Sequence, residues 1–409
     1  MTGIGLRPYR QGDDRKGAKA DVVGRAGPPP RLGVLASHPI QYQAPLYQEL
    51  ARRGRVDLEV AFLSHDGARP YLDPSFGVTL AWDIDLLGGY RSTLLGRRAL
   101  VGKAAWLRSL CRWLRGKDIV VLHGHSDPDV LLAAAACRLL GLPYLLRGDS
   151  HAEPTASGWR GHARHLVAGT VVRGAAGALS IGQRNAAFYR RYADIPDYRA
   201  PYSVDNDRFL AMSQRARPAR AERLTVLGLE PERPTVVFSG KLIEQKRPLD
   251  LIRAIGACEG RLNLLLLGDG PLMAQARAHE SELPLRCIGF VNQAELPGWY
   301  GCGDVLALPS GREPWGLVVN EGMACGLVPV VSQAVGCAAD LVEGVGEVFP
   351  VGDVPALAAA LMRAAANAAE RSERVRARLS RFTLAATASG YERAAIALAR
   401  PPRAGRPAA

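Results

Sequence analysis

The sequence predicts an α/β protein made of two doubly wound, Rossmann-like domains that face a central cleft. The chain has 409 residues, which is more than one ordinary hydrophobic core accommodates. Short apolar strands alternate with helical segments, the pattern of a parallel sheet covered by helices. Each strand is a nearly continuous apolar run, which is typical of strands buried on both faces. This alternation occurs twice along the chain, so we predict two sheets.

The strands form two series on either side of a joint at APYSVDNDRF (200–209). The first series is RLGVLAS, VDLEVAFLS, DIVVLHGH, LPYLLRGDS and GALSIG, and the second is PTVVFSG, LNLLLLGDG, LRCIGF, DVLALPS and LVPVVSQ. We predict an N-terminal domain over 31–209, a C-terminal domain over 210–380, and a helix over 381–400 that packs back on the N-terminal domain. Because of their composition, we expect residues 1–30 to be a disordered leader and residues 401–409 a frayed tail.

The composition is that of a soluble globular protein, with 48% hydrophobic and 22% charged residues. No apolar run is long enough to cross a membrane, and the first residues, MTGIGLRPYRQGDD, lack the apolar core of a signal peptide. Seven cysteines without a C-x-x-C pair favour a reducing compartment and argue against a disulfide framework or zinc site. We therefore expect a cytoplasmic protein. The formal net charge of +13 suits an anionic partner.

The stretch REPWGLVVNEGMACGLVPV (312–330) places one carboxylate in a turn and a second on the helix that follows. Glu313 precedes Pro314 and Gly316 in the turn, and Glu321 lies on the helix. A helix start offers free backbone N–H groups and a positive dipole end to a phosphate. A carboxylate accepts two hydrogen bonds, which suits a vicinal diol such as ribose. One ligand with phosphates and hydroxyls, a nucleotide sugar, would satisfy all of these groups.

The same stretch closely resembles the signature of family 4 glycosyltransferases, usually written E-x-F-G-x-x-x-x-E-A-M-A-x-G-x-P-V. Trp315 replaces the usual Phe, and Gly322 replaces the usual Ala. FSGKLIEQKRPLDLIRAI resembles the family's G-R-L-x-x-x-K-G segment, in which two basic residues hold the donor diphosphate; Lys241 replaces the usual Arg. LLLLGDGP, IGFV, YGCGDVLALPS and PYSVDNDRF resemble further family segments. The resemblance covers residues 200–353, in order.

This resemblance implies a retaining, metal-independent glycosyltransferase of the GT-B fold, which needs no cofactor. It implies catalytic roles for Glu313, Lys241, Lys246 and His125, the last chosen over His123 because VVLHGHSDPD resembles a family strand end. It implies that the donor is bound by Gly240, Phe290, Val291, Trp315, Gly316, Leu317 and Glu321. The lysines and the helix start would stabilise the departing diphosphate electrostatically.

The first domain resembles the family less closely, since ASHPIQYQAP stands where relatives often have a Gly-Gly turn. We assign His38, Gln41 and Arg147 to the acceptor side. Arg147 either meets a phosphate or an acidic sugar of the acceptor, or pairs with Asp149 or Glu153.

Three Asp-x-Asp patterns could in principle hold a divalent metal on the donor: Asp83/Asp85, Asp127/Asp129 and Asp205/Asp207. The second pair begins a helix, which capping and the helix dipole explain. We interpret none of the three as a metal site.

The segment RRALVGKAAWLRSLCRWLRGK (97–117) contains no acidic residue and predicts an amphipathic helix. As one helix it places Leu100, Leu107, Leu110 and Leu114 on a stripe facing the sheet, and Arg108, Arg112 and Arg115 on another stripe. Trp106 and Trp113 would lie near the border, where aromatic rings suit a lipid interface. We expect peripheral association with an anionic membrane surface, on the inner face of the cytoplasmic membrane. The alternative is a packed helix with a solvated basic face.

We therefore predict a glycosyltransferase that acts on a lipid-linked or polysaccharide glycan in envelope or exopolysaccharide biosynthesis. Its partners would be a nucleoside-diphosphate sugar and a glycan or lipid-linked acceptor, without nucleic acid. The alternatives are a nucleotide-sugar epimerase or phosphorylase on the same fold, and a non-catalytic sugar-nucleotide-binding module. An epimerised donor, or phosphate-dependent sugar release without an acceptor, would identify the former.

Overall fold

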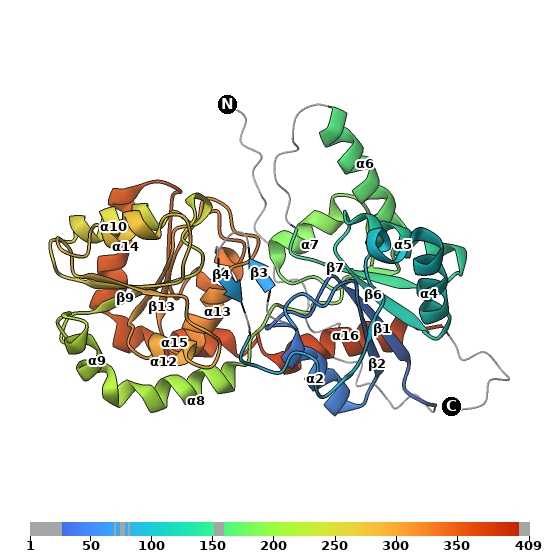
Figure 1. Ribbon diagram of the computed structural model, residues 1–409, viewed down its shortest axis with the longest axis horizontal. Coiled ribbons are helices and arrows are strands. Elements are labelled where there is room, and N and C mark those ends of the chain that lie inside the picture. Colours follow the sequence, from blue (N-terminus) through green and yellow to red (C-terminus); the bar gives the residue numbers. More distant parts are fainter. Residues whose placement is uncertain (1–26, 69–70, 74–77, 81, 151–158, 401–409) are drawn as a thin grey trace.

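Two α/β domains lie side by side in the computed structural model of the protein (Figure 1). The structure describes residues 27–68, 71–73, 78–80, 82–150 and 159–400. Each domain contains a six-stranded sheet in which all neighbouring strands run parallel, with helices against it. This confirms the predicted fold class. Most of the predicted leader, residues 1–26, and the predicted tail, 401–409, lie outside the described residues.

The N-terminal sheet has the strand order β5-β2-β1-β6-β7-β8. Its strands are β1 (Arg31–Ala36), β2 (Asp57–Phe62), β5 (Arg91–Leu94), β6 (Ile119–His123), β7 (Tyr144–Arg147) and β8 (Gly177–Ala178). The helices of this domain are α2 (Ala44–Arg53), α3 (Arg98–Val101), α4 (Lys103–Arg115), α5 (Pro128–Leu139), α6 (Trp159–Arg173) and α7 (Gln183–Arg190). A separate antiparallel pair is formed by β3 (Tyr71–Asp73) and β4 (Val78–Leu80).

The C-terminal sheet has the strand order β11-β10-β9-β12-β13-β14. Its strands are β9 (Thr235–Ser239), β10 (Asn263–Leu267), β11 (Leu285–Gly289), β12 (Val305–Leu308), β13 (Val328–Ser332) and β14 (Glu347–Phe349). Its α-helices are α8 (Asn206–Ala216), α9 (Arg220–Val226), α10 (Pro248–Ala257), α11 (Met273–Arg277), α12 (Leu296–Tyr300), α13 (Leu317–Ala324), α14 (Val354–Ala366) and α15 (Ala368–Leu379). Shorter helical turns are η1 (Arg217–Ala219), η2 (Glu244–Lys246) and η3 (Ala338–Val342).

Both sheets use the same doubly wound order, in which the chain reverses direction across the sheet beside its first strand. The reversal lies between β1 and β6 in the first domain and between β9 and β12 in the second. Open α/β sheets bind ligands outside the carboxyl ends of the strands at this point. The fold therefore marks one candidate ligand position in each domain.

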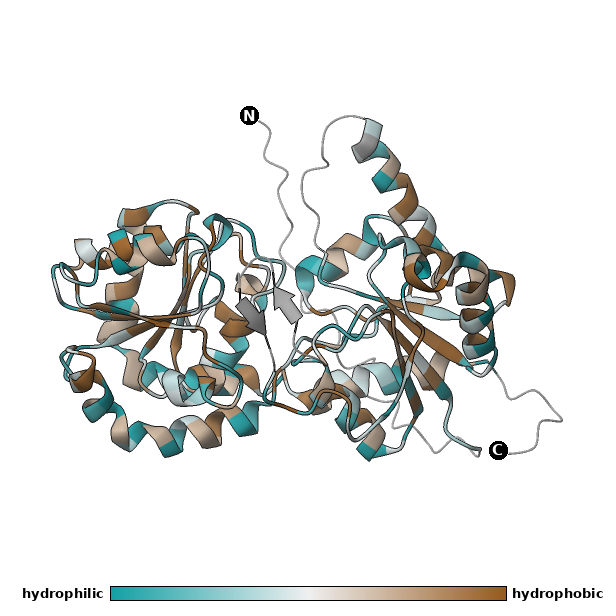
Figure 2. Ribbon diagram, in the orientation of Figure 1, coloured by the Kyte–Doolittle hydropathy of each residue, from teal (hydrophilic) through white to brown (hydrophobic). Residues whose placement is uncertain are grey.

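The sequence pattern missed two edge strands for different reasons. All four residues of β5 are exposed, so they form no apolar run, and β14 is only three residues long. The central strands are the opposite case. All five residues of β10 are buried, because helices cover both faces of the sheet. Figure 2 shows the hydrophobic residues concentrated along these strands.

The C-terminal helix, α16 (Leu384–Leu398), packs against the N-terminal domain although it follows the second domain in the chain. Ala388, Tyr391, Ala394 and Ala395 are part of the N-terminal hydrophobic core. Glu392 of α16 is buried and accepts two hydrogen bonds from the Arg53 guanidinium of α2, at 2.7 and 2.8 Å. A charged bidentate pair of this kind fixes orientation as well as position. The two domains are thus linked both at residues 200–205 and through α16.

Candidate functional site

The loops that follow β9 and β10 are packed backbone against backbone. Gly240 and Gly268 have φ angles of +146° and +144°, which residues with side chains rarely adopt. A Cβ on Gly268 would overlap the carbonyl oxygen of Gly240. A Cβ on Gly240, in contrast, would have the Lys246 Cε, 4.0 Å away, as its nearest atom. The Gly240–Lys241 backbone therefore lies at the carboxyl end of β9, where the sheet reversal predicts a ligand.

Two of the predicted catalytic residues meet at this position. Lys246, at the end of η2, forms an ion pair with the carboxylate of Glu313, and both side chains are largely buried. The loops that carry them are also joined, since Gln245 Nε2 donates to the Arg312 carbonyl at 2.9 Å and Gly311 N donates to the Gln245 carbonyl at 2.8 Å. Sixty-seven positions separate Lys246 from Glu313 along the chain, and the fold brings them into contact.

The turn that carries Glu313 is held by backbone hydrogen bonds to the chain after β13. Glu313 forms a parallel bridge with Val335. Gly336 N donates to the Glu313 carbonyl at 2.9 Å, and Cys337 N donates to the Trp315 carbonyl at 3.0 Å. A Cβ on Gly336 would overlap the backbone of this turn, so the close approach requires glycine. The position of the Glu313 carboxylate therefore depends on the segment 335–337.

Helix α13 begins directly after this turn. Its N-cap is Gly316, which has a φ of +96° and no side chain to cap the helix, and Leu317 is its first residue. The first N–H groups of the helix are therefore available to an anion. These N–H groups follow Glu313, the carboxylate of the ion pair with Lys246, by only a few positions along the chain. This combination of a helix start, a lysine and a carboxylate suits a ligand that contains both phosphate and hydroxyl groups.

Glu321 lies further along α13 in a nearly enclosed environment. It is only 8% exposed, and its Oε2 accepts a hydrogen bond from the Tyr300 hydroxyl at 2.9 Å. Burial raises the pKa of the Glu321 carboxyl to about 7, although the Tyr300 hydrogen bond and the Arg208 charge oppose this shift. Tyr300 lies in the segment YGCGDVLALPS, and the sequence predicted no role for it. In the structure it orients the carboxylate that we assign to the donor ribose.

Trp315 does not fit the donor-binding role that its place in the motif implied. Its side chain is buried, and its indole N–H donates to Asn320 Oδ1 at 2.9 Å. The ring packs edge-on against Tyr202, with centroids 6.0 Å apart, and near Phe382. A Cβ on Gly182 of the N-terminal domain would overlap the Trp315 ring. We therefore revise Trp315 to a packing residue between the domains.

The segment after β11, predicted to line the pocket for the donor base, is contacted by the N-terminal domain. The Trp82 ring lies 6.3 Å from the Phe290 ring, centroid to centroid, and Val291 follows Phe290. The Asp83 carboxylate accepts a hydrogen bond from Ala294 N at 3.0 Å. Sequence reasoning missed Trp82, because no periodicity or motif surrounds it. It considered Asp83 only as a possible metal ligand.

In the N-terminal domain, the carboxyl ends of β1 and β6 carry the predicted histidines. His123 is fixed by Gln43 Nε2 at 3.2 Å and by the Tyr391 hydroxyl at 3.3 Å, and burial lowers its pKa to about 3. His125 lies beyond the strand, partly buried against the Phe188 ring at 5.0 Å. Burial lowers the pKa of His125 as well, so its imidazole is neutral near pH 7. Of the two, His125 has the less enclosed position.

His38 and Gln41 follow β1 and are partly buried. His38 Nδ1 lies 2.9 Å from Ser37 Oγ, and burial lowers the pKa of its imidazole. Because His38 follows β1 and His125 follows β6, both lie where the first sheet reverses. This arrangement is compatible with the acceptor side that we assigned to His38 and Gln41.

The structure encloses Arg147 in protein, which does not favour the acceptor-side role predicted for it, and Glu153, one of its two predicted alternative partners, lies outside the described residues. Its side chain is 2% exposed, and Nη1 donates to the carbonyl of Ala200 at 2.7 Å. The guanidinium stacks on Tyr202 and on Tyr391, at 5.0 and 5.2 Å from the ring centroids. Arg147 therefore connects β7 to the domain joint and to α16 instead of reaching a ligand.

Four of the six aspartates in the three Asp-x-Asp patterns are engaged in local structure. Asp127 caps α5 and pairs with Arg97, Asp129 pairs with Arg98, Asp205 caps α8, and Asp85 accepts hydrogen bonds from Leu87 N and Gly88 N. Within the part of the chain that the structure describes, no group of three or more His, Cys, Asp or Glu side chains could hold a metal ion.

The basic segment 97–117 is not one continuous helix, and this changes which residues it exposes. Gly102, with a φ of +82°, separates α3 from α4. Trp106 and Trp113 are buried in the core, so the prediction that they lie near a lipid interface was wrong. Leu100 and Leu107 are instead 84% and 46% exposed. Within the unbroken α4, Trp106, Leu110, Trp113 and Leu114 share the buried face at helical spacing, so the apolar stripe includes the tryptophans and leaves Leu107 outside it.

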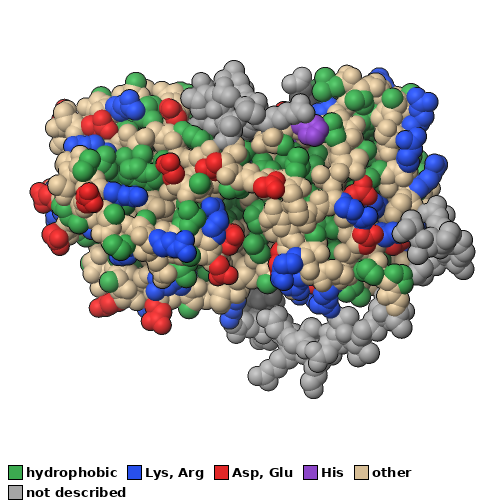
Figure 3. All heavy atoms as spheres, turned by 60° about the horizontal axis from the view of Figure 1, so that its bottom comes forward, with side chains coloured by type: hydrophobic (Ala, Val, Ile, Leu, Met, Phe, Trp, Pro, Cys, Tyr) green, Lys and Arg blue, Asp and Glu red, His purple; other side chains and the backbone are tan. Residues whose placement is uncertain are grey.

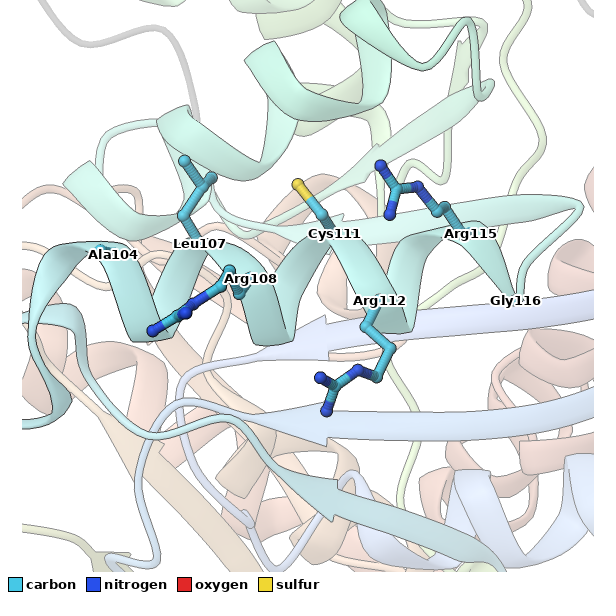
Figure 4. A pocket seen from close by; sticks show the side chains of 7 residues that line it. All are labelled: Ala104, Leu107, Arg108, Cys111, Arg112, Arg115 and Gly116. Carbon is cyan, nitrogen blue, oxygen red and sulfur yellow. The ribbon is translucent and has the colours of Figure 1, made fainter.

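The outer face of α4 forms an open hollow lined by basic and apolar side chains (Figure 4). Leu107, Cys111 and Arg115 point to one side of the helix, and Arg108 and Arg112 point to the other. Figure 3 shows Lys and Arg side chains along the outer edge of this domain. None of the helices in the described parts of the chain is long and apolar enough to cross a membrane.

Comparison with known proteins yields related sequences and related folds. Residues 233–367 match the family Glycosyl transferases group 1. A D-inositol 3-phosphate glycosyltransferase of Xylanimonas cellulosilytica is 35% identical over 147 residues, which are 33% of this chain and 34% of that protein. The lipopolysaccharide core biosynthesis mannosyltransferase LpsB of Rhizobium meliloti is 26% identical over 247 residues, covering 58% and 65% of the two chains. The matches thus span between about a third and about two thirds of these relatives.

Among solved structures, HepE of Anabaena in complex with UDP superposes with a TM-score of 0.70 at 16% identity, covering 90% of this chain and all of that one. This likeness concerns the fold, and it extends over both domains. The sequence match, in contrast, is centred on the domain that contains Lys246, Glu313 and α13. Residues 233–367 are therefore similar to the Glycosyl transferases group 1 family, within a chain that has the two-domain GT-B fold.

Proposed function

We propose that the protein is a retaining, family 4 glycosyltransferase that transfers a sugar from a nucleoside-diphosphate sugar to an acceptor hydroxyl. The observation that carries this proposal is the Lys246–Glu313 pair at the sheet reversal of the second domain, beside the free start of α13. This pair provides a cation for a diphosphate and a carboxylate for sugar hydroxyls. The glycosyltransferase names of the relatives support the same activity.

In this mechanism the difficult step is departure of the diphosphate while positive charge develops on the sugar ring. Lys241, Lys246 and the first N–H groups of α13 stabilise the leaving group, and Glu313 stabilises the ring and holds its hydroxyls. When the donor binds, Lys246 is shared between Glu313 and the phosphates. His125 approaches the sugar from the other domain as a neutral hydrogen-bonding group. The acceptor attacks on the face that the diphosphate leaves, and the leaving phosphate accepts its proton.

The identity of the acceptor is inferred from the relatives. LpsB is named for lipopolysaccharide core biosynthesis, and another relative is named a phosphatidyl-myo-inositol mannosyltransferase. We infer a lipid-linked or polysaccharide glycan acceptor in envelope or exopolysaccharide biosynthesis. The relatives named here are transferases, so an epimerase, a phosphorylase or a non-catalytic binding module is not favoured.

A screen of nucleotide sugars tests the activity directly. A ligand present at 100 times its Kd stabilises the folded state by about 2.7 kcal/mol, so the true donor raises the Tm by several degrees. The same donor is slowly hydrolysed without an acceptor, and NMR of the released sugar reports whether the anomeric configuration is retained. If no uridine or guanosine diphosphate sugar shifts the Tm or is hydrolysed, the proposal is wrong.

The same hydrolysis assay in the presence of EDTA tests whether the lysines and the start of α13 stabilise the departing diphosphate without a metal ion. We expect the rate to be unchanged within about twofold, because the mechanism assigns no charge stabilisation to a metal. Complete loss of hydrolysis in EDTA, restored by manganese or magnesium, would contradict this assignment.

We further propose that the outer face of α4 binds an anionic membrane surface, which would bring the enzyme to a lipid-linked acceptor. Arg108, Arg112 and Arg115 are exposed there beside the exposed Leu107, and Leu100 is exposed on the preceding helix α3. Because the two tryptophans are buried, they cannot contribute to a lipid interface. The exposed Leu100 and Leu107 provide apolar surface for it instead. Basic side chains with adjacent apolar groups match the charge and the interior of an anionic lipid surface.

Sedimentation with anionic vesicles at low salt measures this association. Each basic residue near such a surface contributes about 1 kcal/mol, so changing Arg108, Arg112 and Arg115 to Ser should weaken binding about a hundredfold. Binding should also decrease as salt rises. The matched control changes three exposed arginines that lie outside α4, Arg277, Arg374 and Arg381, to Ser, with the same loss of charge. Equal recovery with neutral and anionic vesicles, or equal losses in both triple variants, would exclude this surface.

A further inference from the structure

The segment after β13 is held from the N-terminal domain by the start of α7. The guanidinium of Arg184 donates from Nη2 to the Gln333 carbonyl at 2.9 Å and from Nη1 to the Val335 carbonyl at 3.3 Å. In Figure 1, α7 lies on the side of its domain that faces the second domain. A planar guanidinium that binds two carbonyls fixes both their spacing and their direction. Arg184 therefore defines the path of residues 333–335.

A second contact lies five residues further along. Gln183 N, the first amide of α7, donates to Asp340 Oδ2 at 3.0 Å, and Arg199 forms an ion pair with the same carboxylate. The Asp340 side chain is buried, whereas that of Arg199 is 43% exposed. The segment 333–340 is thus held by the N-terminal domain at each end.

The same segment is the backbone partner of the turn that carries Glu313. Val335, whose carbonyl Arg184 binds, is the residue that bridges to Glu313. The next two amides, of Gly336 and Cys337, donate to the carbonyls of Glu313 and Trp315. The chain of contacts from Arg184 to Glu313 therefore passes through one intermediate backbone segment, residues 335–337.

A third contact reaches the turn directly. Gly182 immediately precedes α7, and its backbone packs so closely on Trp315 that a Cβ would overlap the ring. Trp315 is two residues from Glu313. Contacts between domains within one chain commonly open and close. Opening here would withdraw Arg184, Gln183 and Gly182 together from the segment and from the turn.

We propose that Arg184 is a positioning residue for the reaction, which holds the Glu313 turn in its working place only while the two domains are in contact. The inference rests on the proposed function for the role of Glu313. Its consequence is regulatory: a donor bound to the second domain alone meets a loosened carboxylate and is turned over slowly. Closure of the N-terminal domain, which also brings His125 and the acceptor side, completes the site.

The test compares Arg184→Met with Arg190→Met, which changes an exposed arginine at the other end of the same helix. Hydrogen–deuterium exchange of the full chain reports the amides of Gly336 and Cys337 without requiring activity. In Arg184→Met we expect at least tenfold faster exchange in peptides covering 311–317 and 333–337. Donor hydrolysis should slow about tenfold or more, whereas the Kd for uridine or guanosine diphosphate should change less than threefold. Arg184→Lys, which reaches one carbonyl, should be intermediate.

The possible results separate this inference from the proposed function. Unchanged exchange in Arg184→Met shows that Arg184 does not hold the turn, and overturns the inference. Faster exchange with an unchanged rate of hydrolysis shows that Arg184 holds the turn but does not position Glu313 for the reaction. This result also overturns the inference. If the wild-type protein binds no nucleoside diphosphate and hydrolyses no donor, the proposed function fails, and the exchange data alone decide whether Arg184 holds the turn.

Discussion

Changing Glu313 to Gln should reduce kcat on the order of 10²–10³-fold while leaving donor affinity within about threefold of wild type. Glutamine keeps the size of the side chain and its hydrogen bonds but removes the negative charge that supports the sugar ring in the transition state. It also removes the ionic partner of Lys246. The released lysine is then free to serve the diphosphate, so the Kd for the nucleoside diphosphate should be unchanged or lower. Steady-state kinetics and calorimetric titration separate the two effects.

The matched control is Glu343→Gln, because Glu343 is an exposed carboxylate in the same domain. That variant should retain wild-type kcat and Kd. Equal Tm values for both variants would show that the fold is intact. A Glu313→Gln enzyme with nearly normal turnover on the true donor would remove Glu313 from the mechanism. A variant that loses donor affinity instead of kcat would assign Glu313 to ground-state binding.

The sequence predicted what depends on local backbone and on motifs. Gly240, Lys246, Glu313 and Gly316 lie at the carboxyl ends of β9 and β12 because the motif residues directly follow buried apolar strands. The spacing within each segment therefore located them correctly in the loops that follow these strands. It could not reveal the Lys246–Glu313 ion pair, since the partners lie on loops 67 positions apart.

Arg147 and Trp315, whose predicted roles we revised, are both enclosed by parts of the chain that are distant in the sequence. Arg147 is covered by Tyr202 and Tyr391, and Trp315 by Gly182 and Phe382. No local pattern encodes these partners, because they come from the other domain, from the joint or from the chain's end. Leu107 was misplaced for a local reason, since the buried face of α4 is formed by the tryptophans with Leu110 and Leu114, whereas Leu100 lies on α3, beyond the break at Gly102.

Glu321 should give the second large effect, and it is visible as a dependence of donor binding on pH. The carboxyl has a pKa of about 7 in the folded protein, because burial disfavours its charged form. An ionised carboxylate is the stronger acceptor for the ribose diol, so the donor should bind most tightly above pH 7. Between pH 8 and pH 6 the Kd of the intact nucleotide sugar should rise up to about tenfold. Glu321→Ala should bind the donor weakly at every pH.

The same pKa makes a prediction for stability with a defined sign. The carboxyl binds its proton more tightly in the folded protein, with a pKa of about 7, than in the unfolded chain, where the reference value is 4.5. The free energy of unfolding therefore falls as pH rises from 4.5 to 7 and stays lower above pH 7, by about 3 kcal/mol. Glutamine at this position still accepts the Tyr300 hydrogen bond but carries no charge. Glu321→Gln should thus exceed the wild type in stability at pH 8 by about 3 kcal/mol and match it near pH 4.5.

Urea unfolding of both proteins at several pH values measures this difference. The comparison is needed because other buried groups also titrate: the lowered pKa of His123, about 3, makes both proteins lose stability as pH falls below its ordinary value of 6.5. That contribution is common to wild type and variant and cancels in the difference. A stability difference that does not change with pH would show that Glu321 titrates normally. In that case its carboxylate is ionised throughout the physiological range, and the pH dependence of donor binding must come from another group. If both dependences appear together, one buried carboxylate lowers the stability of the free protein and strengthens its binding of the donor.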